Sequence, residues 1–258
     1  MKKVVLVLFI IVTIIVDRSI NPTARSQDVS LAPKLFVGGG ALPEAMYEEF
    51  IQLTGLDAKL VVIPTASSRE VEIEKIKDQW RSRGLKEISV MHTIDRNVAS
   101  SAEFIEPLRT ANAVWFSGGS QQRIADAYLG TPVEDELYEL LKRGGVIGGS
   151  SAGAAILSRV MISSGNDPPK ITTGLRLLPG AIIDQHFLKR NRLARLISAI
   201  RSHPDLIGLG IDEGTAIIVS NKEYKVVGGS YVLRIELIDG SLKIDAFEDG
   251  DIIPMADH

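Results

Sequence analysis

The sequence predicts an α/β protein: a mostly parallel sheet with helices on both faces, extended by antiparallel strands from the C-terminal third of the chain. Three observations lead to this fold class. Short apolar segments alternate with amphipathic ones from residue 34 to 159, several apolar segments end in glycine-rich runs, and closely spaced strand-like segments follow residue 208. With 45% hydrophobic and 24% charged residues, the composition is that of a globular protein and excludes a disordered or collagen-like chain.

The predicted parallel strands are short apolar runs that end at glycine, proline or polar residues. Pro64, for example, stops the second run, because proline has no N–H group to contribute to a sheet. Runs that are apolar throughout are typical of strands buried on both faces of a parallel sheet. The predicted strands are Lys34–Val37, Lys59–Ile63, Glu87–His92, Ala111–Phe116 and Val146–Gly148.

The predicted helices place apolar residues three or four positions apart, which gives each helix one apolar face. Gly84 is a natural C-cap for the second of them. Thr131 begins the fourth as its N-cap, with Pro132 at the first helical position. The predicted helices are Glu44–Leu53, Val71–Arg83, Gln122–Leu129, Pro132–Arg143 and Ala152–Arg159.

The C-terminal third reads as a series of short strands joined by tight turns such as Asn221-Lys222 and Asp239-Gly240. We expect these strands to be antiparallel and to extend one edge of the sheet. They are Gly208–Ile211, Ala216–Ser220, Lys225–Gly228, Tyr231–Leu237 and Lys243–Ala246. Since no repeat or linker divides the chain, residues 27–258 are predicted to form a single domain.

Residues 1–26 have the pattern of a secretory signal peptide. Lys2 and Lys3 precede an almost uniformly apolar run, residues 4–16, which is shorter than the roughly 20 residues of a membrane-spanning helix. Ala24 and Ser26 are small and favour cleavage near Ser26, so the sequence predicts a secreted or periplasmic protein with no membrane span after cleavage. The alternatives are an uncleaved N-terminal anchor and a buried N-terminal strand.

The composition also excludes several classes of function. The net charge of −3 provides no basic surface for nucleic acid. The chain has no cysteine, which excludes disulfides, thiolate zinc sites and a cysteine nucleophile. The four histidines lack the spacing of metal ligands, so neither a metal nor a cofactor is predicted. Gly38-Gly39-Gly40 is not a dinucleotide-binding motif, because Pro43 stands where the third glycine should be.

The segment Gly149-Ser150-Ser151-Ala152-Gly153 matches the G-x-S-x-G pattern of a nucleophile elbow. It follows an apolar strand and precedes a predicted helix, which is the context that such an elbow requires. Its small residues permit a sharp turn that exposes the hydroxyl of Ser151, and the amide of Ala152 is placed to donate to an oxyanion. The alternative is a Gly/Ser-rich turn that only tightens the packing of strand on helix.

A serine nucleophile needs a base, and His186 is the best candidate by elimination. It follows an apolar run and lies among polar residues at a predicted strand end, whereas His92, His203 and His258 have no such setting. A histidine with a purely structural role is the alternative.

The base in turn needs a carboxylate that orients it. Asp184 lies two residues before His186 and would share its side of a strand. Glu213 lies in Gly210-Ile211-Asp212-Glu213-Gly214, directly after an apolar run. The residues alone leave both candidates open.

Two further segments carry polar groups that suit a substrate. Arg190, Arg192 and Arg195 are spaced to share one side of a helix and to bind carboxylates. The alternative is a solvated basic helix face. The segment 117–122 ends a predicted buried strand, and there the amide of Gly119 is a second candidate oxyanion donor, while Gln121 is placed to hold substrate.

Taken together and in this order, these segments resemble the cyanophycinase family of serine peptidases, in the wider group that includes aspartyl dipeptidase. The resemblance runs from about Pro33 to the C-terminal strands. Its specific elements are the strand end at residues 118–121, the serine motif, Asp184-Gln185-His186-Phe187 with the three arginines, and residues 210–213.

This resemblance implies a flavodoxin-like three-layer sandwich and a Ser–His–Glu triad of Ser151, His186 and Glu213. It implies cleavage of cyanophycin, a poly-aspartate whose β-carboxyls carry arginine, to β-Asp-Arg dipeptides. At family level it also implies a homodimer. The residues expected to contact substrate are Gln121, Asp184, Gln185, Arg190, Arg192 and Arg195.

Two other functions remain open from the sequence. One is a peptidase of the same mechanism that acts on other aspartyl or isoaspartyl peptides. The other is a catalytically silent peptide-binding module on the same scaffold.

Overall fold

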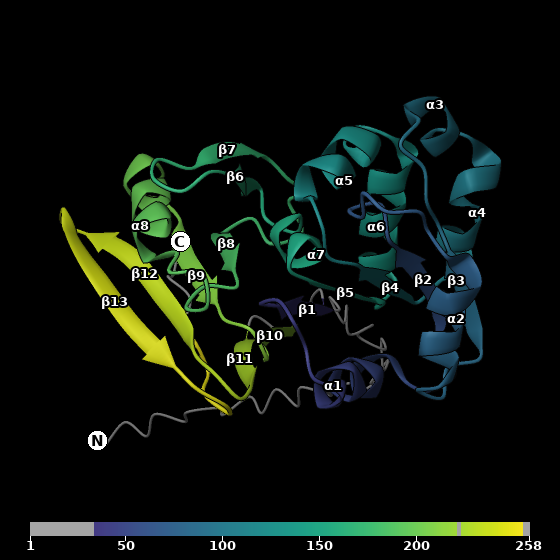
Figure 1. The fold of residues 1–258 in the computed structure, drawn as a ribbon, viewed down its shortest axis with the longest axis horizontal. Helices are drawn as coiled ribbons and strands as arrows, with labels where there is room; N and C mark the ends of the chain where they lie inside the picture. The colour runs from purple at the N-terminus through teal and green to yellow at the C-terminus, as the bar shows by residue number, and fades with distance from the viewer. Residues whose placement is uncertain (1–33, 221–222, 255–258) are drawn as a thin grey trace, which may run out of the picture. The chain divides into compact units, whose positions relative to one another are not determined.

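The centre of the molecule is a seven-stranded sheet with the strand order β11-β10-β1-β5-β4-β2-β3. The computed structural model describes residues 34–220 and 223–254 (Figure 1). The five strands from β1 to β3 in that order are parallel, and β10 and β11 are antiparallel additions next to β1. The strands are β1 (Lys34–Gly38), β2 (Lys59–Ile63), β3 (Glu87–Val90), β4 (Ala113–Phe116), β5 (Val146–Ser150), β10 (Thr215–Ser220) and β11 (Glu223–Gly228).

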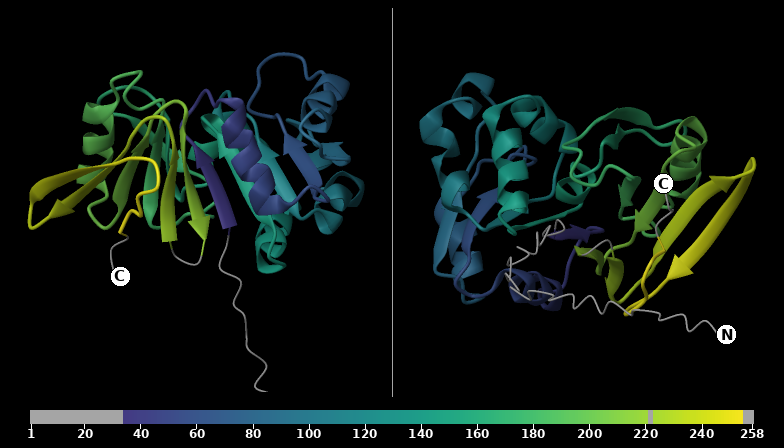
Figure 2. Two further views of the ribbon diagram at one scale, coloured as in Figure 1. Left: turned by 90° about the horizontal axis from the view of Figure 1, so that it is seen from below. Right: turned by 180° about the vertical axis from the view of Figure 1, so that it is seen from behind.

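Helices cover both faces of this sheet, as the sequence predicts (Figure 2). One face packs on α1 (Glu44–Thr54) and α2 (Ile73–Arg81) through an aromatic core that includes Trp80 and Trp115. The opposite face packs on the remaining helices of this part of the chain. These are α3 (Arg96–Ala99), α4 (Ala102–Thr110), α5 (Gln121–Tyr128), α6 (Pro132–Lys142) and α7 (Ala152–Ala155).

The helix after the serine motif is shorter than predicted. Of the predicted span, 152–159, only α7 is helical, because the residues after α7 form hydrogen bonds with distant parts of the chain instead. Ser158 Oγ accepts a hydrogen bond from the amide of Ile183 at 3.2 Å, and the carbonyl of Arg159 accepts one from Gly174 at 3.0 Å. α7 is therefore a single turn held between the central sheet and the next part of the chain.

The C-terminal third departs from the predicted arrangement. Only β10 and β11 extend the central sheet, whereas β9 and the strands after β11 form a second, four-stranded sheet in the order β13-β12-β9-β8, in which β8 and β9 are parallel. Glycines make this possible: side chains at Gly208 and Gly210 of β9 would collide with Leu196 of α8 and with Phe187. The elements are β8 (Ala181–Gln185), α8 (Leu193–Ser202), β9 (Ile207–Ile211), β12 (Val232–Ile238), β13 (Ser241–Phe247) and the hairpin of β6 (Val160–Ser164) with β7 (Lys170–Thr173).

The carboxyl ends of the parallel strands meet at one edge of the central sheet. Gly38 of β1 pairs with Ser150 of β5, and Phe116 of β4 pairs with Gly149, so the segments that follow these three strands emerge side by side. The glycine-rich strand ends therefore share one edge of the sheet, which is where α/β proteins place their ligands.

The predicted signal peptide over residues 1–26, with its cleavage near Ser26, lies outside the described residues. Among the helices at residues 34–220 and 223–254, none combines the length and the apolar character that crossing a membrane requires.

Candidate active site

Ser151 lies at a strained turn between β5 and α7. Its backbone angles are φ 55° and ψ −114°, a region that residues with side chains rarely adopt. Two glycines of the motif permit this turn. A Cβ on Gly149 would overlap the carbonyl of Gly153, and one on Gly153 would overlap the carbonyl of Phe116 in β4. The G-x-S-x-G pattern therefore exists here because only glycine lets α7 pack this close to the sheet.

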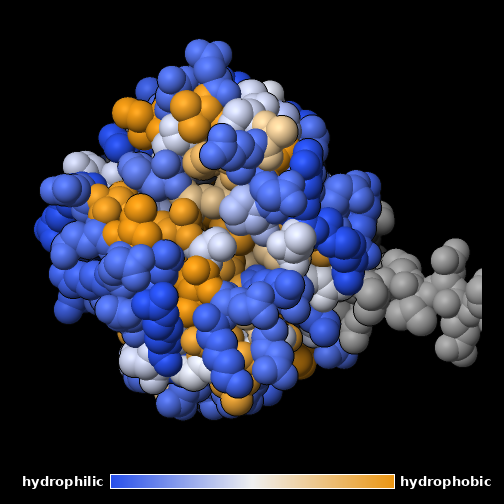
Figure 3. All heavy atoms as spheres, turned by 90° about the vertical axis from the view of Figure 1, so that its right-hand side faces the viewer, coloured by the Kyte–Doolittle hydropathy of each residue, from blue (hydrophilic) through white to orange (hydrophobic). Residues whose placement is uncertain are grey.

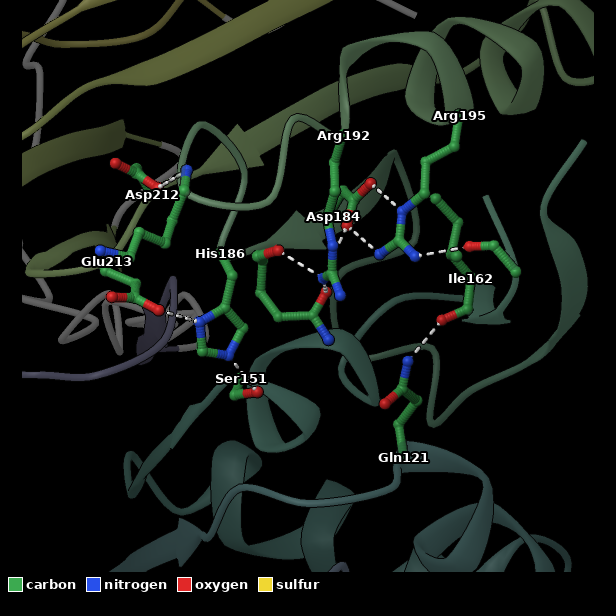
Figure 4. Close-up of polar contacts among 12 residues, drawn as sticks. Gln121, Ser151, Ile162, Asp184, His186, Arg192, Arg195, Asp212 and Glu213 are labelled. Carbon is green, nitrogen blue, oxygen red and sulfur yellow. Dashed lines mark hydrogen bonds and ion pairs between the residues drawn. The ribbon is translucent and has the colours of Figure 1, made fainter. Parts of the chain in front are cut away.

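His186 directly follows β8 and reaches the serine hydroxyl. Its Nε2 lies 2.8 Å from Ser151 Oγ (Figure 4). The backbone of His186 also has a positive φ, 51°, and its amide donates to the carbonyl of Gly39. Because Gly39 belongs to the segment after β1, this bond ties the histidine of the second sheet to the central sheet.

Glu213, and not Asp184, meets the other nitrogen of the imidazole. Glu213 Oε1 lies 2.7 Å from His186 Nδ1, so the series Ser151–His186–Glu213 is continuous (Figure 4). The turn that carries Glu213 is fixed by its neighbour Asp212, whose carboxylate accepts from the amide of Lys189 at 2.9 Å and from the hydroxyl of Ser230 at 3.0 Å.

Gly40, whose role the sequence does not reveal, leaves room for the contact between His186 and Glu213. A Cβ on Gly40 would overlap the Nδ1 atom of His186 and come within 3.0 Å of Cγ of Glu213. The Gly38-Gly39-Gly40 run therefore provides room for the imidazole and its carboxylate. The sequence shows only that these glycines follow a predicted strand. That Gly40 lies against His186 depends on the fold.

The surroundings of His186 keep its imidazole uncharged. Burial lowers the pKa of His186 below its ordinary value, and the hydrogen bond that its imidazole donates to Glu213 opposes this shift only in part. The positive charges of Arg190 and Arg192 lower the pKa further. A neutral imidazole with Glu213 on Nδ1 carries its free electron pair on Nε2, where it can accept the proton of Ser151.

Of the two predicted oxyanion donors, Ala152 directly follows Ser151, and Gly119 follows Gly118, whose position is close to the serine. Ala152 is the first residue of α7, so its amide has no partner within the helix. The segment after β4 passes close to the serine, since a methyl group on Gly118 would lie 4.0 Å from Ser151 Oγ. Gly119 has φ 142°, and a Cβ there would overlap the carbonyl of Ala66. This glycine therefore lets the segment run tightly between the 64–67 turn and the serine.

Asp184 and Arg195 form a buried ion pair. Asp184 is fully buried, and its Oδ2 accepts from Arg195 Nε at 2.6 Å, with a second contact between Oδ1 and Nη2. Arg195 Nη1 also donates to the carbonyl of Gly165 at 2.8 Å. The arginine is thus neither on a solvated helix face nor open to solvent, and its hydrogen bonds within the chain position the segment between β8 and α8.

The other predicted substrate residues form a wall next to Ser151. Arg192 Nη1 donates to Oε1 of Gln185 at 3.0 Å, and Gln121 Nε2 donates to the carbonyl of Ile162 at 2.6 Å (Figure 4). Burial lowers the pKa of Arg192 to about 10, which leaves it protonated at neutral pH. Arg190 is exposed. Of the six residues, Arg190 therefore has its guanidinium accessible, while the others already have partners within the chain.

A cavity of about 230 Å³ opens on the other side of the nucleophile. It is bounded by Gly118 and Ser150 near the serine, and by Tyr47, Trp80 and Arg83 from α1, α2 and the turn after α2. These last residues were not predicted as part of a site. They come from two predicted helices that are far apart in the sequence, and only the fold brings them together at the carboxyl edge of the sheet.

A second cavity, of about 730 Å³, lies at the outer edge of the sheet between β3, α2 and α4. Its lining includes Ile73, Val98 and Phe104, and Figure 3 shows apolar side chains gathered among charged ones on this side of the molecule. Neither cavity is lined by a residue of the Ser–His–Glu series, but the smaller one, unlike the larger, includes Ser150, the neighbour of Ser151. Within residues 34–220 and 223–254, no group of three or more His, Cys, Asp or Glu side chains is arranged to hold a metal ion.

The fold and the site together define the class of the protein. A serine at a strained strand–helix turn, bonded to a histidine that a carboxylate orients, is the arrangement of serine peptidases and related acyl-transfer enzymes. Within this class, the chain belongs to peptidase family S51, whose family model matches residues 35–227.

Curated relatives of this chain are cyanophycinases. The cyanophycinase of Synechococcus elongatus is 39% identical over 197 residues, which are 72% of this chain and 61% of that protein. The cyanophycinase of Geminocystis herdmanii is 34% identical over 224 residues, 81% of this chain and 82% of the relative. The chain thus spans less than two thirds of the length of the Synechococcus protein.

Solved structures share the fold. A peptidase from an acI-B1 Actinobacterium superposes with a TM-score of 0.71 at 27% identity, covering 87% of this chain and 97% of the other. A putative peptidase E from Listeria monocytogenes gives a TM-score of 0.55 at 20% identity, a likeness of fold alone. The predicted fold class, a mostly parallel sheet with an antiparallel C-terminal part, is confirmed.

Proposed function

We propose that this protein is an exported serine peptidase that hydrolyses cyanophycin to β-Asp-Arg dipeptides. The observation that supports the mechanism most directly is the hydrogen-bonded series Ser151–His186–Glu213. The choice of substrate is supported by the identity of 34–39% with cyanophycinases.

In the proposed mechanism, Ser151 Oγ attacks the α-carbonyl carbon of an aspartyl residue whose β-carboxyl is amidated. His186 takes the hydroxyl proton and Glu213 stabilises the imidazolium that results. The intermediate collapses with cleavage of the C–N bond, and His186 delivers its proton to the leaving amine. Water, deprotonated by His186, then attacks the acyl ester and releases the second product with Ser151 restored.

The amides of Ala152 and Gly119 are the proposed donors to the oxyanion. Ala152 directly follows Ser151, and Gly119 follows Gly118, which lies near the serine. This supports the role, because donors that are fixed before the reaction stabilise the charge that develops in the transition state. We assign substrate contacts first to Arg190, which is exposed, and to Arg192 and Gln121 at the wall of the site. Asp184, Gln185 and Arg195 would support this wall from within.

The test is product analysis by mass spectrometry after incubation with insoluble cyanophycin. We expect β-Asp-Arg from the wild type and a loss of several orders of magnitude in rate for Ser151→Ala. Ser241→Ala, at an exposed serine of β13, is the matched control and should keep full activity. Full activity of Ser151→Ala would refute the nucleophile.

A second candidate function keeps the mechanism and changes the substrate. If wild type releases no β-Asp-Arg but cleaves short peptides with N-terminal or isoaspartyl residues, the protein is an aspartyl or isoaspartyl peptidase. If neither is cleaved and a serine-reactive phosphonate fails to label Ser151 in folded protein, the scaffold is a silent peptide-binding module. Labelling without cleavage would retain the hydrolase and discard both substrates.

Export and assembly are further parts of the proposal. Export is supported by the basic and apolar pattern of residues 1–26, which would leave residues 27–258 as the mature peptidase domain in the periplasm or outside the cell. A homodimer is proposed on the family resemblance, and light scattering of the purified mature chain would measure it.

A further inference from the structure

The cavity on the α1–α2 side of Ser151 is built around one arginine. The guanidinium of Arg83 lies 3.9 Å above the ring centroid of Tyr47 and 5.1 Å from that of Trp80. Its Nε and Nη2 bind the two carboxylate oxygens of Glu44, at 2.5 and 3.0 Å. The Arg83 side chain is only 16% exposed. A guanidinium held by two rings and a bidentate carboxylate has little conformational freedom left to lose on binding a ligand.

One donor group of this arginine remains available. Among the residues that the structure describes, Arg83 Nη1 has no hydrogen-bond acceptor. This atom is not fully buried. Arg83 is also the single charged residue that lines this cavity within the described part of the chain. The cavity therefore presents a fixed positive group with a free N–H, next to the polar surface of Gln79 and Ser117.

The chemistry of the lining selects the ligand. The faces of Tyr47 and Trp80 are already covered by the chain's own guanidinium, and the lining includes no carboxylate that would attract a second one. An arginine side chain of the substrate would therefore meet a charge of its own sign here, with the neighbouring Glu44 already bound to Arg83. A carboxylate would find Arg83, and charge-assisted hydrogen bonds between guanidinium and carboxylate are among the strongest available.

The position of the cavity suits the part of the substrate that lies on the other side of the cleaved bond from Gln121 and Arg192. Gly118 and Ser150 connect it to Ser151, and it lies over the sheet face covered by α1 and α2. Gln121, on α5, belongs to the opposite face, where its side chain contacts β6. A peptide bond at Ser151 would thus have one flank toward Gln121 and Arg192 and the other toward Arg83.

We propose that Arg83 is a specificity-determining residue that binds a free carboxylate of the substrate on the α1–α2 side of the scissile bond. This inference rests on the proposed peptidase function. It defines the substrate class as peptides with a free carboxylate near the cleaved bond, which includes the arginine carboxylates of cyanophycin and the α-carboxylate of an isoaspartyl peptide.

The test uses binding rather than turnover, so that it stands apart from the proposed reaction. The chain has two tryptophans, Trp80 and Trp115, and both line this cavity, so intrinsic fluorescence reports on it directly. Folded Ser151→Ala protein is titrated with a trimer of β-aspartyl-arginine units, as the free acid and with its arginine carboxylates amidated. The acid form should bind at least about tenfold more tightly, since it can pair with the guanidinium.

Three variants in the Ser151→Ala background make the test specific. Arg83→Gln should lose most of the preference for the acid, apart from what Arg190 and Arg192 contribute. Arg81→Gln, which removes an exposed arginine at the end of α2 and outside the cavity, should keep the preference for the acid. Glu44→Gln should strengthen acid binding, because it releases the guanidinium from its internal carboxylate. This last variant also separates a binding role from a structural one, which would predict only a loss of stability.

The outcomes separate the two proposals. Equal binding of acid and amide by Ser151→Ala, or an unchanged preference in Arg83→Gln, overturns the role of Arg83. A preference that depends on Arg83, with no cleavage of any substrate by wild type, would keep this site and reject the proposed reaction. If Arg83→Gln fails to fold, Glu44→Gln decides: acid binding no tighter than that of its parent overturns the inference.

Discussion

His186 can accept a proton only while its imidazole is uncharged, so its pKa sets the acidic limit of activity. Because burial lowers that pKa, we expect kcat/KM to reach its plateau already at weakly acidic pH. Arg190→Gln removes a positive charge that disfavours the imidazolium, so the pKa of His186 should rise and the acidic limb of the profile should move to higher pH. Stopped-time product assays from pH 4 to 8 would measure this shift.

The control for this prediction is Lys189→Gln. Lys189 is an exposed cation next to Arg190 in the chain, but its charge is not among the causes of the His186 shift. The limb should therefore stay in place. A profile that moves equally in both variants, or in neither, would contradict the assigned electrostatics.

Much of the site can be predicted from single residues and their neighbours in the sequence, for a physical reason. The G-x-S-x-G pattern specifies a turn that few sequences can make, so Ser151 is predicted from local geometry alone. The residues by themselves do not choose between Asp184 and Glu213, because that choice depends on which carboxylate the fold brings to Nδ1 of His186. The family resemblance points to Glu213, and the structure places it there.

The connection between β8 and α8 depends on the buried pair of Asp184 and Arg195. Asp184→Asn would leave the arginine charge without its partner in the interior, so we expect the free energy of unfolding to fall by about 3–5 kcal/mol. Urea denaturation followed by circular dichroism would measure it. Asp205→Asn, which removes an exposed partner of Arg159 at 3.7 Å, should change stability by less than about 1 kcal/mol.

This experiment also distinguishes support from recognition. A variant Asp184→Asn of unchanged stability but raised KM would show that the carboxylate contacts substrate instead of fixing the segment. The sequence suggests substrate contact for Asp184 and Arg195, since it shows charge but not burial. Their mutual pairing appears only once β8 and α8 lie side by side.

At the level of whole elements, segments with a clear apolar pattern are predicted well, and segments without one are not. The five parallel strands and α1, α2, α5 and α6 all lie within a few residues of their predicted bounds. The prediction contains no helix between residues 93 and 110, yet α3 and α4 lie there. Pro107 inside α4 weakens the helical signal, and α3 is a single turn. Such elements are stabilised by packing rather than by their own propensities.

For the molecule as a whole, the N-terminal segment makes a separate prediction. If residues 1–26 are a signal peptide, the protein recovered from outside the cytoplasm should begin at Gln27. Intact-mass measurement of the protein purified from periplasm or medium would show this. A chain that retains Lys2 and Lys3 and sediments with membranes would support the uncleaved anchor instead.

The three residues of the proposed triad come from two different sheets. Ser151 follows β5 of the central sheet, while His186 and Glu213 follow β8 and β9 of the four-stranded sheet. Neither sheet alone holds a complete set. If these three residues form the triad, a growing chain would gain hydrolytic activity only after residue 213 of 258 has been made and both sheets have docked. Nascent or partly opened chains would then not hydrolyse other proteins. This latency would come from the topology and would need neither a propeptide nor an inhibitor.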